Sequence, residues 1–75
     1  MYYVYLFRRG DNGQTYIGYT QNLRKRLKEH RLKKPDLVYY EAYKDERDAR
    51  RREMILKERG QTVRRLKEKL KFSLI

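Results

Sequence analysis

The absence of cysteine from a chain of only 75 residues is the feature that most restricts how it can fold. A chain this short buries only about 60% of the surface that it exposes when unfolded, so many domains of this size depend on disulfides or a structural metal. Without thiols, neither a disulfide framework nor a zinc–thiolate site can form. We therefore expect a single domain over residues 1–75 that is stabilised by packing and suits a reducing cytoplasm.

The charge of the chain is strongly unbalanced. It has 21 Lys and Arg residues against 10 Asp and Glu residues, a formal net charge of +11. Lys and Arg side chains that neutralise phosphates release condensed counterions, which favours a polyanionic partner. A highly charged soluble surface would explain the density of charge but not its imbalance. Nucleic acid is therefore the expected partner, with DNA favoured over RNA, and the expected oligomeric state is a monomer or a weak dimer.

Membrane association is not expected. No apolar run approaches the roughly 20 residues that a spanning helix needs. The apolar start at residues 1–7 lacks a basic region before it and ends at Arg8-Arg9, which is not the pattern of a signal peptide. The expected location is the cytoplasm.

Three segments have the composition of β-strands. Residues 2–7 are aromatic, β-branched or leucine, and residues 15–19 follow an Asn12-Gly13 turn signal. Residues 36–43 are again rich in tyrosine and large apolar side chains. We expect the first two strands to form a hairpin and the third to complete the sheet.

Three helices are predicted between and after these strands. The first follows a cap at Thr20 or Asn22 and runs to about Lys33, because Pro35 cannot continue it. The second begins at Asp45 and ends at Gly60, and the third follows a Thr62 cap. The predicted fold is α+β, a small three-stranded antiparallel sheet flanked by three helices in the order ββαβαα.

Two tyrosines are predicted to share one face of the hairpin. If Asn12-Gly13 is a two-residue turn, odd positions of the first strand face the same side as even positions of the second. Tyr3, Tyr5, Tyr16 and Gly18 then lie on one face, where two hydroxyls beside a glycine can form the floor of a phosphate site. The alternative is that these tyrosines are half-buried packing residues with a solvated tip.

Arg26 and His30 are four residues apart in the first predicted helix and so lie on one face of it. A guanidinium offers a planar fork to two phosphate oxygens, and an imidazole can transfer a proton near neutral pH. Arginine is common in this chain and a single histidine is often an ordinary helix residue, so the pair also has a purely structural interpretation.

Glu53 lies in the apolar stripe of the second helix, between Ala49 and Leu56. A carboxylate that points inward needs a cation, and magnesium prefers oxygen ligands. The alternative is a surface ion pair with Lys57 or Arg50 at helical spacing.

Taken together, these motifs resemble the GIY-YIG nuclease superfamily, especially its short stand-alone bacterial members and the nuclease module of a bacterial nucleotide-excision-repair subunit. The two signature triplets correspond to Tyr3-Val4-Tyr5 and Tyr16-Ile17-Gly18. Residues 23–30 fall at the family's distance behind them, and residues 49–57 resemble its acidic helix.

The resemblance implies a role for each candidate residue. Glu53 would bind Mg2+ or Mn2+, and Arg26 would stabilise phosphate charge in the transition state. Tyr16 would be the general base, Tyr5 its partner, and His30 a proton relay or phosphate contact. The expected nucleic-acid contacts are Gly18, Arg24, Lys25, Arg52 and Lys57.

The function that these expectations describe is that of a metal-dependent endonuclease. It would hydrolyse phosphodiester bonds in nucleic acid, in DNA repair or processing, with low sequence specificity. One alternative is a non-catalytic basic module that binds nucleic acid on the same fold. Another is a basic scaffold for an acidic protein partner.

Overall fold

Three antiparallel strands form the centre of the protein, in the spatial order β2-β1-β3. The structure is a computed structural model and describes residues 1–10, 13–29 and 35–74. The strands are β1 (Tyr2–Arg9), β2 (Thr15–Thr20) and β3 (Pro35–Tyr43). The predicted α+β fold and the element order ββαβαα are both confirmed. Both β2 and β3 are edge strands, so the long apolar strand β1 is the one paired on both sides.

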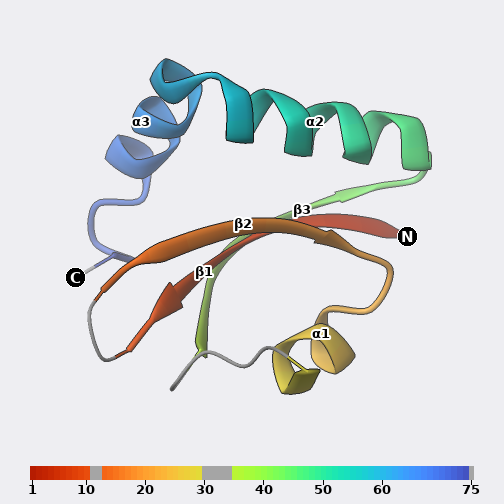
Figure 1. The fold of residues 1–75 in the computed structure, drawn as a ribbon, viewed down its shortest axis with the longest axis horizontal. Coiled ribbons are helices and arrows are strands. Elements are labelled where there is room, and N and C mark those ends of the chain that lie inside the picture. The colour runs from red at the N-terminus through yellow and green to blue at the C-terminus, as the bar shows by residue number, and fades with distance from the viewer. Residues whose placement is uncertain (11–12, 30–34, 75) are drawn as a thin grey trace.

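The helices cover both faces of this sheet (Figure 1). Helix α1 (Leu23–Glu29) lies against one face, and α2 (Glu46–Glu58) and α3 (Gly60–Lys69) lie against the other. None of the helices in the described ranges is long and apolar enough to cross a bilayer.

Side-chain caps start the first two helices. The Asn22 side chain accepts a hydrogen bond from the Lys25 backbone N–H at 3.0 Å, so Asn22 caps α1. Asp45 caps α2 by accepting from the Arg47 N–H at 2.9 Å. Hydrogen bonds from the Arg47 side chain and backbone lower the pKa of Asp45 to about 2. The predicted end of the first helix near Lys33 lies outside the described residues.

The junction of α2 and α3 differs from the prediction. Gly60 is the first residue of α3 rather than a left-handed cap that ends α2, and Thr62 lies inside the first turn of α3. The residue between the helices is Arg59, in an extended conformation, and its N–H donates to the Ile55 carbonyl at 2.9 Å. A single extended residue is enough to turn the chain here, so the glycine does not need a positive φ.

The β1–β2 hairpin has a different register from the one that a two-residue turn would give. Tyr5 pairs with Gly18, an offset of two residues, and Arg9 donates its N–H to the Gln14 carbonyl at 2.7 Å. Asn12 lies outside the described residues. Because side chains alternate with a period of two, a two-residue offset leaves every side chain on its predicted face. Tyr3, Tyr5, Tyr16 and Gly18 therefore do share one face.

A β-bulge interrupts the pairing of β1 with β3. Leu6 pairs with Tyr39 and Phe7 with Leu37, which leaves Val38 as the additional residue. The bulge reverses the alternation along β3, so Leu37 and Tyr39 face opposite sides although both numbers are odd. Tyr39 packs against the core on the α2 side.

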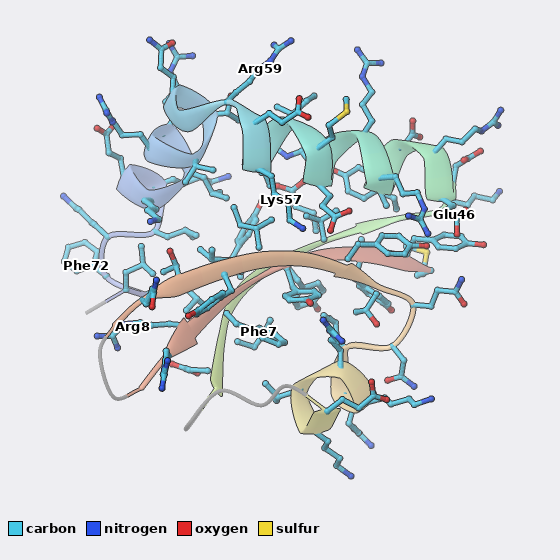
Figure 2. The ribbon with its side chains drawn as sticks, in the orientation of Figure 1. Phe7, Arg8, Glu46, Lys57, Arg59 and Phe72 are labelled. Atoms are coloured by element: carbon cyan, nitrogen blue, oxygen red, sulfur yellow. The ribbon has the colours of Figure 1, made fainter. Side chains whose placement is uncertain are left out.

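The two faces of β1 are both buried, which explains its nearly continuous apolar sequence. On the α2 side, Val4 packs with Ala49, Leu56 and Leu66. On the α1 side, Phe7 is completely buried, and its ring lies 4.2 Å from that of Tyr5, centroid to centroid. In Figure 2, the Phe7 ring lies on the side of the sheet that α1 covers. Packing therefore holds the ring of Tyr5 in place independently of any hydrogen bond to its hydroxyl.

Candidate active site

Tyr5 and Arg26 form a direct pair on the α1 face of the sheet. The Arg26 Nε–H donates to the Tyr5 hydroxyl at 2.9 Å, and Tyr5 is only 3% exposed. The hydrogen bond to Tyr5 raises the pKa of Arg26, which favours the cationic guanidinium further. The hydrogen bond to Tyr5 uses only the Nε–H of Arg26. The two terminal nitrogens can therefore still bind a pair of anionic oxygens. Sequence reasoning placed both residues in the site, and the fold brings them into contact.

Gly18 provides the space for the Tyr5 ring. A Cβ atom added at Gly18 would lie 2.1 Å from the Tyr5 hydroxyl and 2.3 Å from Cζ of the ring. These distances are far inside van der Waals contact, and Gly18 itself is buried beneath the phenol. The glycine of the second triplet is therefore required by the position of Tyr5, whereas the prediction assigned it to contact with the substrate.

Replacing Gly18 with alanine is expected to destabilise the protein by about 1–3 kcal/mol, because the new methyl group displaces a packed ring. The same displacement breaks the hydrogen bond between Tyr5 and Arg26. Urea unfolding followed by circular dichroism measures the loss. Gly60→Ala is a matched control, since a Cβ there meets nothing within 4 Å. Equal stability of the two variants would contradict this role for Gly18.

Tyr16 lies on the same face as Tyr5, further toward the start of the edge strand β2. Its hydroxyl donates a hydrogen bond to Gln14 Oε1 at 3.0 Å. This hydrogen bond fixes the direction of the phenolic O–H at the start of β2. Gln14 thus orients the phenol, a role that sequence reasoning missed because a single glutamine after a turn carries no distinctive signal. His30 lies outside the described residues.

Glu53 points toward the sheet, as its place in the apolar stripe predicted, and its side chain is only 21% exposed. It also forms the predicted alternative contact, an ion pair with Lys57 at 3.2 Å. However, α2 and α1 cover opposite faces of the sheet (Figure 1). The structure therefore does not place Glu53 on the Tyr5–Arg26 face, because the inward side of α2 looks at the other side of the strands.

The position of Glu53 along the sheet follows from its neighbours on α2. Glu46, seven residues earlier on the same stripe of the helix, accepts a hydrogen bond from the Tyr19 hydroxyl of β2 at 2.8 Å. Seven helical residues advance about 10.5 Å, and α2 runs antiparallel to β2 (Figure 1). Three strand residues span about 10 Å, so Glu53 is expected level with Tyr16. The carboxylate and the phenol then approach the open edge of β2 from its two sides.

A partly buried ionic cluster joins α2 to β3. The Glu41 carboxylate of β3 accepts from Arg52 Nε at 2.9 Å and from Arg52 Nη2 at 3.1 Å, and also from the hydroxyls of Tyr39 and Tyr43. Arg52 was expected to contact nucleic acid, but its guanidinium is engaged by this carboxylate. The alternation of Tyr39, Glu41 and Tyr43 on one strand face was the signal that could have revealed the cluster.

The cluster changes the ionisation of its members. Burial opposes ionisation of Glu41, but the hydrogen bonds from Arg52, Tyr43 and Tyr39 outweigh it, and the pKa of Glu41 is lowered from its ordinary 4.5. Burial and the hydrogen bond to Glu41 raise the pKa of Tyr43 to about 12. Because a lowered carboxyl pKa favours the folded state only while the group is ionised, this stabilisation is present above pH 4.5 and is lost as the pH falls below it.

Glu41→Gln is expected to lower the free energy of unfolding at pH 7 by roughly 1–3 kcal/mol, since it removes a charged acceptor from four donors. The difference from the wild-type protein should shrink as the pH falls below 4.5 and through the lowered pKa of Glu41 in the folded protein. Urea unfolding at pH 7 and pH 3.5 measures both values. Glu58→Gln, which changes an exposed carboxylate at the end of α2, serves as the control. A difference that is constant with pH would contradict the assignment.

The donor set is compatible with a magnesium ion held by few protein ligands. Within the described ranges, no three Asp, Glu, His or Cys side chains gather into a metal-binding group. Magnesium is commonly bound by one or two carboxylates, with waters and substrate phosphate completing its shell. The partly buried Glu53 carboxylate at the sheet edge fits a site of this kind.

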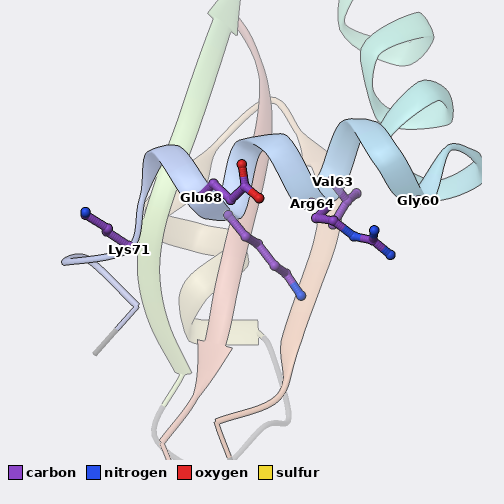
Figure 3. Close-up of a pocket in the computed structure, with 6 residues that line it drawn as sticks. Gly60, Val63, Arg64, Glu68 and Lys71 are labelled. Atoms are coloured by element: carbon purple, nitrogen blue, oxygen red, sulfur yellow. The ribbon is translucent and has the colours of Figure 1, made fainter.

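The surface around α1 is basic, and a hollow lies elsewhere, along α3. Arg24 and Lys25 are exposed on α1, and Lys25 pairs loosely with Glu29 at 3.7 Å. The hollow, about 510 Å³, runs along α3 between Arg64, Lys67 and Lys71 (Figure 3). It is an open groove on the α2 side of the sheet and contains none of the candidate residues.

The fold and the Tyr5–Arg26 pair define a small basic α+β domain with a guanidinium held on one face of its sheet. Comparison with protein families finds the GIY-YIG catalytic domain over residues 1–69. The chain therefore belongs to the GIY-YIG family, a family of nucleases that act on nucleic acid and typically depend on a divalent metal. No curated protein and no solved structure matches the chain significantly.

Proposed function

We propose that this protein is a divalent-metal-dependent endonuclease that hydrolyses phosphodiester bonds with low sequence specificity, and that its substrate is DNA. The observation that carries the proposal is the hydrogen bond from Arg26 to the buried Tyr5, at the centre of a face formed by both signature triplets. A cytoplasmic location and a role in DNA repair or processing belong to the same proposal.

Arg26 is the proposed phosphate-binding group. Its Nε is held by Tyr5 at 2.9 Å, which limits the guanidinium to a narrow range of orientations. A fixed donor aimed at developing charge needs no reorganisation during the reaction, and this is the main advantage of such groups. Tyr5 is then a positioning residue, because its hydroxyl contacts Arg26 and its ring is buried.

Tyr16 is the proposed general base: as it takes up a proton from the attacking water, its own phenolic proton passes to solvent. Its hydroxyl is oriented by Gln14 and lies at the edge strand, where water can approach. His30 remains a proposed proton relay or phosphate contact. In the reaction, the water oxygen bonds to phosphorus, the bond from phosphorus to the leaving oxygen breaks, and the leaving alkoxide takes up a proton.

Glu53 is the proposed metal ligand. A bound magnesium or manganese ion would polarise the phosphate and stabilise the leaving oxygen. The contribution of the chain is a carboxylate held inward by the packing of Ala49 and Leu56 and level with Tyr16 on β2. Lys57, which pairs with Glu53, balances the carboxylate charge when no other cation is near.

The proposed contacts to flanking phosphates are Arg24, Lys25 and Lys57, all of which are exposed. Their long side chains suit contacts to the sugar-phosphate backbone rather than to base edges, in keeping with low specificity. Two residues that were expected to contact nucleic acid are not among these proposed contacts. Gly18 lies beneath Tyr5, and Arg52 is engaged by Glu41.

The test is cleavage of labelled single-stranded, duplex, flap and branched DNA, with the matching RNAs, by purified protein. We expect nicking in magnesium or manganese and none in EDTA, with DNA cut faster than RNA. Cleavage that persists in EDTA, or no cleavage of any substrate with either metal, would refute the proposal.

A non-catalytic nucleic-acid-binding module is the second candidate. The ion pair between Glu53 and Lys57, on the face opposite Arg26, favours it, because this carboxylate already has a cation. This candidate predicts binding that weakens steeply with salt and no hydrolysis under any of the conditions above.

A further inference from the structure

Tyr40 is a half-exposed aromatic residue beside the Tyr5–Arg26 pair. It lies on β3 directly opposite Tyr5, and its side chain is on the same face of the sheet. Although it sits next to the buried Tyr5, Tyr40 is 51% exposed. Gly18, Tyr5 and Tyr40 therefore lie in one row across the three strands. The Tyr5 ring fills the space above Gly18, whereas the Tyr40 ring is partly exposed to solvent.

Within the residues that the structure describes, the ring of Tyr40 packs against the ring of Tyr3. Tyr3 meets it edge to face, with 5.8 Å between ring centroids and 66° between ring planes. Its neighbour on the same face of β3, Ala42, is small and exposed. An edge-to-face contact steadies a ring, and about half of Tyr40 remains accessible to solvent.

The location of this ring determines what can stack on it. Residues directly opposite on antiparallel strands have Cβ atoms about 4.5–5.5 Å apart, so Tyr40 directly flanks the phenol that holds Arg26. A base is joined to its phosphate through one sugar. A phosphate on Arg26 therefore places a neighbouring base within reach of Tyr40.

We propose that Tyr40, supported by Tyr3, is a base-stacking platform that directs the protein to nucleic acid with an unpaired nucleotide beside the bound phosphate. The inference rests on the proposed function in one respect, the binding of a phosphate by Arg26. Bases inside a duplex are already stacked on both faces, so an aromatic ring gains a partner only where a base is unpaired or displaced. The net charge of +11 supplies the attraction to the backbone, and the ring supplies the selectivity.

The first test measures binding in EDTA, so that cleavage plays no part. A labelled oligonucleotide is titrated as a single strand and as a blunt duplex of the same length, at fixed low salt. Stacking contributes enough that Tyr40→Ala should weaken single-strand binding about 5- to 100-fold, whereas duplex binding should change less than about twofold because no base is free to stack. Tyr40→Phe, which keeps the ring, should bind like the wild-type protein.

Phe72→Ala is the matched control, because Phe72 is a 78% exposed aromatic residue beyond α3. It should leave both affinities unchanged. Circular dichroism melting establishes that each variant is folded. Equal losses on single strand and duplex, or a loss in Tyr40→Phe as large as in Tyr40→Ala, would overturn the proposal.

A second test locates the stacked base. The wild-type protein should bind a duplex with one bulged nucleotide more tightly than the same duplex with an abasic bulge, and Tyr40→Ala should abolish this difference. No difference for the wild-type protein would also overturn the platform. A failure of the nuclease proposal would give a different result. Cleavage would be absent, but the preference for unpaired nucleotides would remain.

Discussion

Replacing Glu53 with alanine is expected to reduce magnesium-dependent cleavage by about 10²- to 10⁴-fold, because the variant loses the carboxylate that we assign to the metal. A catalytic ion contributes several kcal/mol of charge stabilisation, and each 1.36 kcal/mol is about tenfold in rate. Nucleic-acid binding in EDTA should stay the same or become slightly tighter, since the change removes a negative charge. Single-turnover cleavage and anisotropy measure the two effects.

The controls separate a metal role from a structural one. Glu58→Ala removes an exposed carboxylate from the same helix and should leave cleavage unchanged. Lys57→Ala removes the ion-pair partner of Glu53 and should lower the magnesium concentration needed for half-maximal cleavage, because the competing cation is gone. Equal cleavage by the wild-type protein and Glu53→Ala at every magnesium concentration would contradict the assignment and favour the non-catalytic module.

Replacing Arg26 with alanine is expected to lower the cleavage rate by about 10²- to 10³-fold, the usual effect of removing one positioned donor from a developing charge. Arg26→Lys should recover little of this loss. Lysine keeps the charge but lacks the Nε–H that binds Tyr5, and it cannot offer a planar pair of donors. Tyr5→Phe keeps the guanidinium but frees its orientation, so its loss should be smaller than that of Arg26→Ala.

Arg24→Ala is the matched control for Arg26, since Arg24 is an exposed arginine on the same helix. Its loss should be in affinity rather than in the chemical step, with the salt dependence of binding reduced by about one unit of slope. Single-turnover rates at saturating protein distinguish the two. If Arg24→Ala and Arg26→Ala slow the chemical step equally, the special role of the Tyr5–Arg26 pair is wrong.

The elements were predictable because local patterns determine them. The apolar run at residues 2–7 and the Asn22 and Asp45 caps each depend on neighbouring residues, and the structure confirms the strand and the helix starts that they predict. Tyr5, Tyr16 and Gly18 share one face as predicted, although the predicted hairpin register was wrong. An offset of two residues preserves the alternation of side chains between the two faces.

The β-bulge and the ionic cluster were not predictable in the same way. The bulge at Val38 reverses the facing of the first part of β3, and it depends on how that strand pairs with β1. Arg52 in a chain this basic suggested a phosphate contact, whereas Glu41, 11 residues earlier, is its partner. Both features depend on contacts between distant segments, which local spacing does not reveal.

The sequence by itself determined the positive charge, the types of the elements and which residues within one element share a face. These follow from composition and from the periods of strands and helices, which are local properties of the backbone. Only the tertiary structure decided that Arg26 binds Tyr5, that Gly18 makes room for that ring, and that α1 and α2 lie on opposite faces. The physical reason is that packing between elements depends on strand order and on which surfaces close the core, and the period of a single segment contains neither.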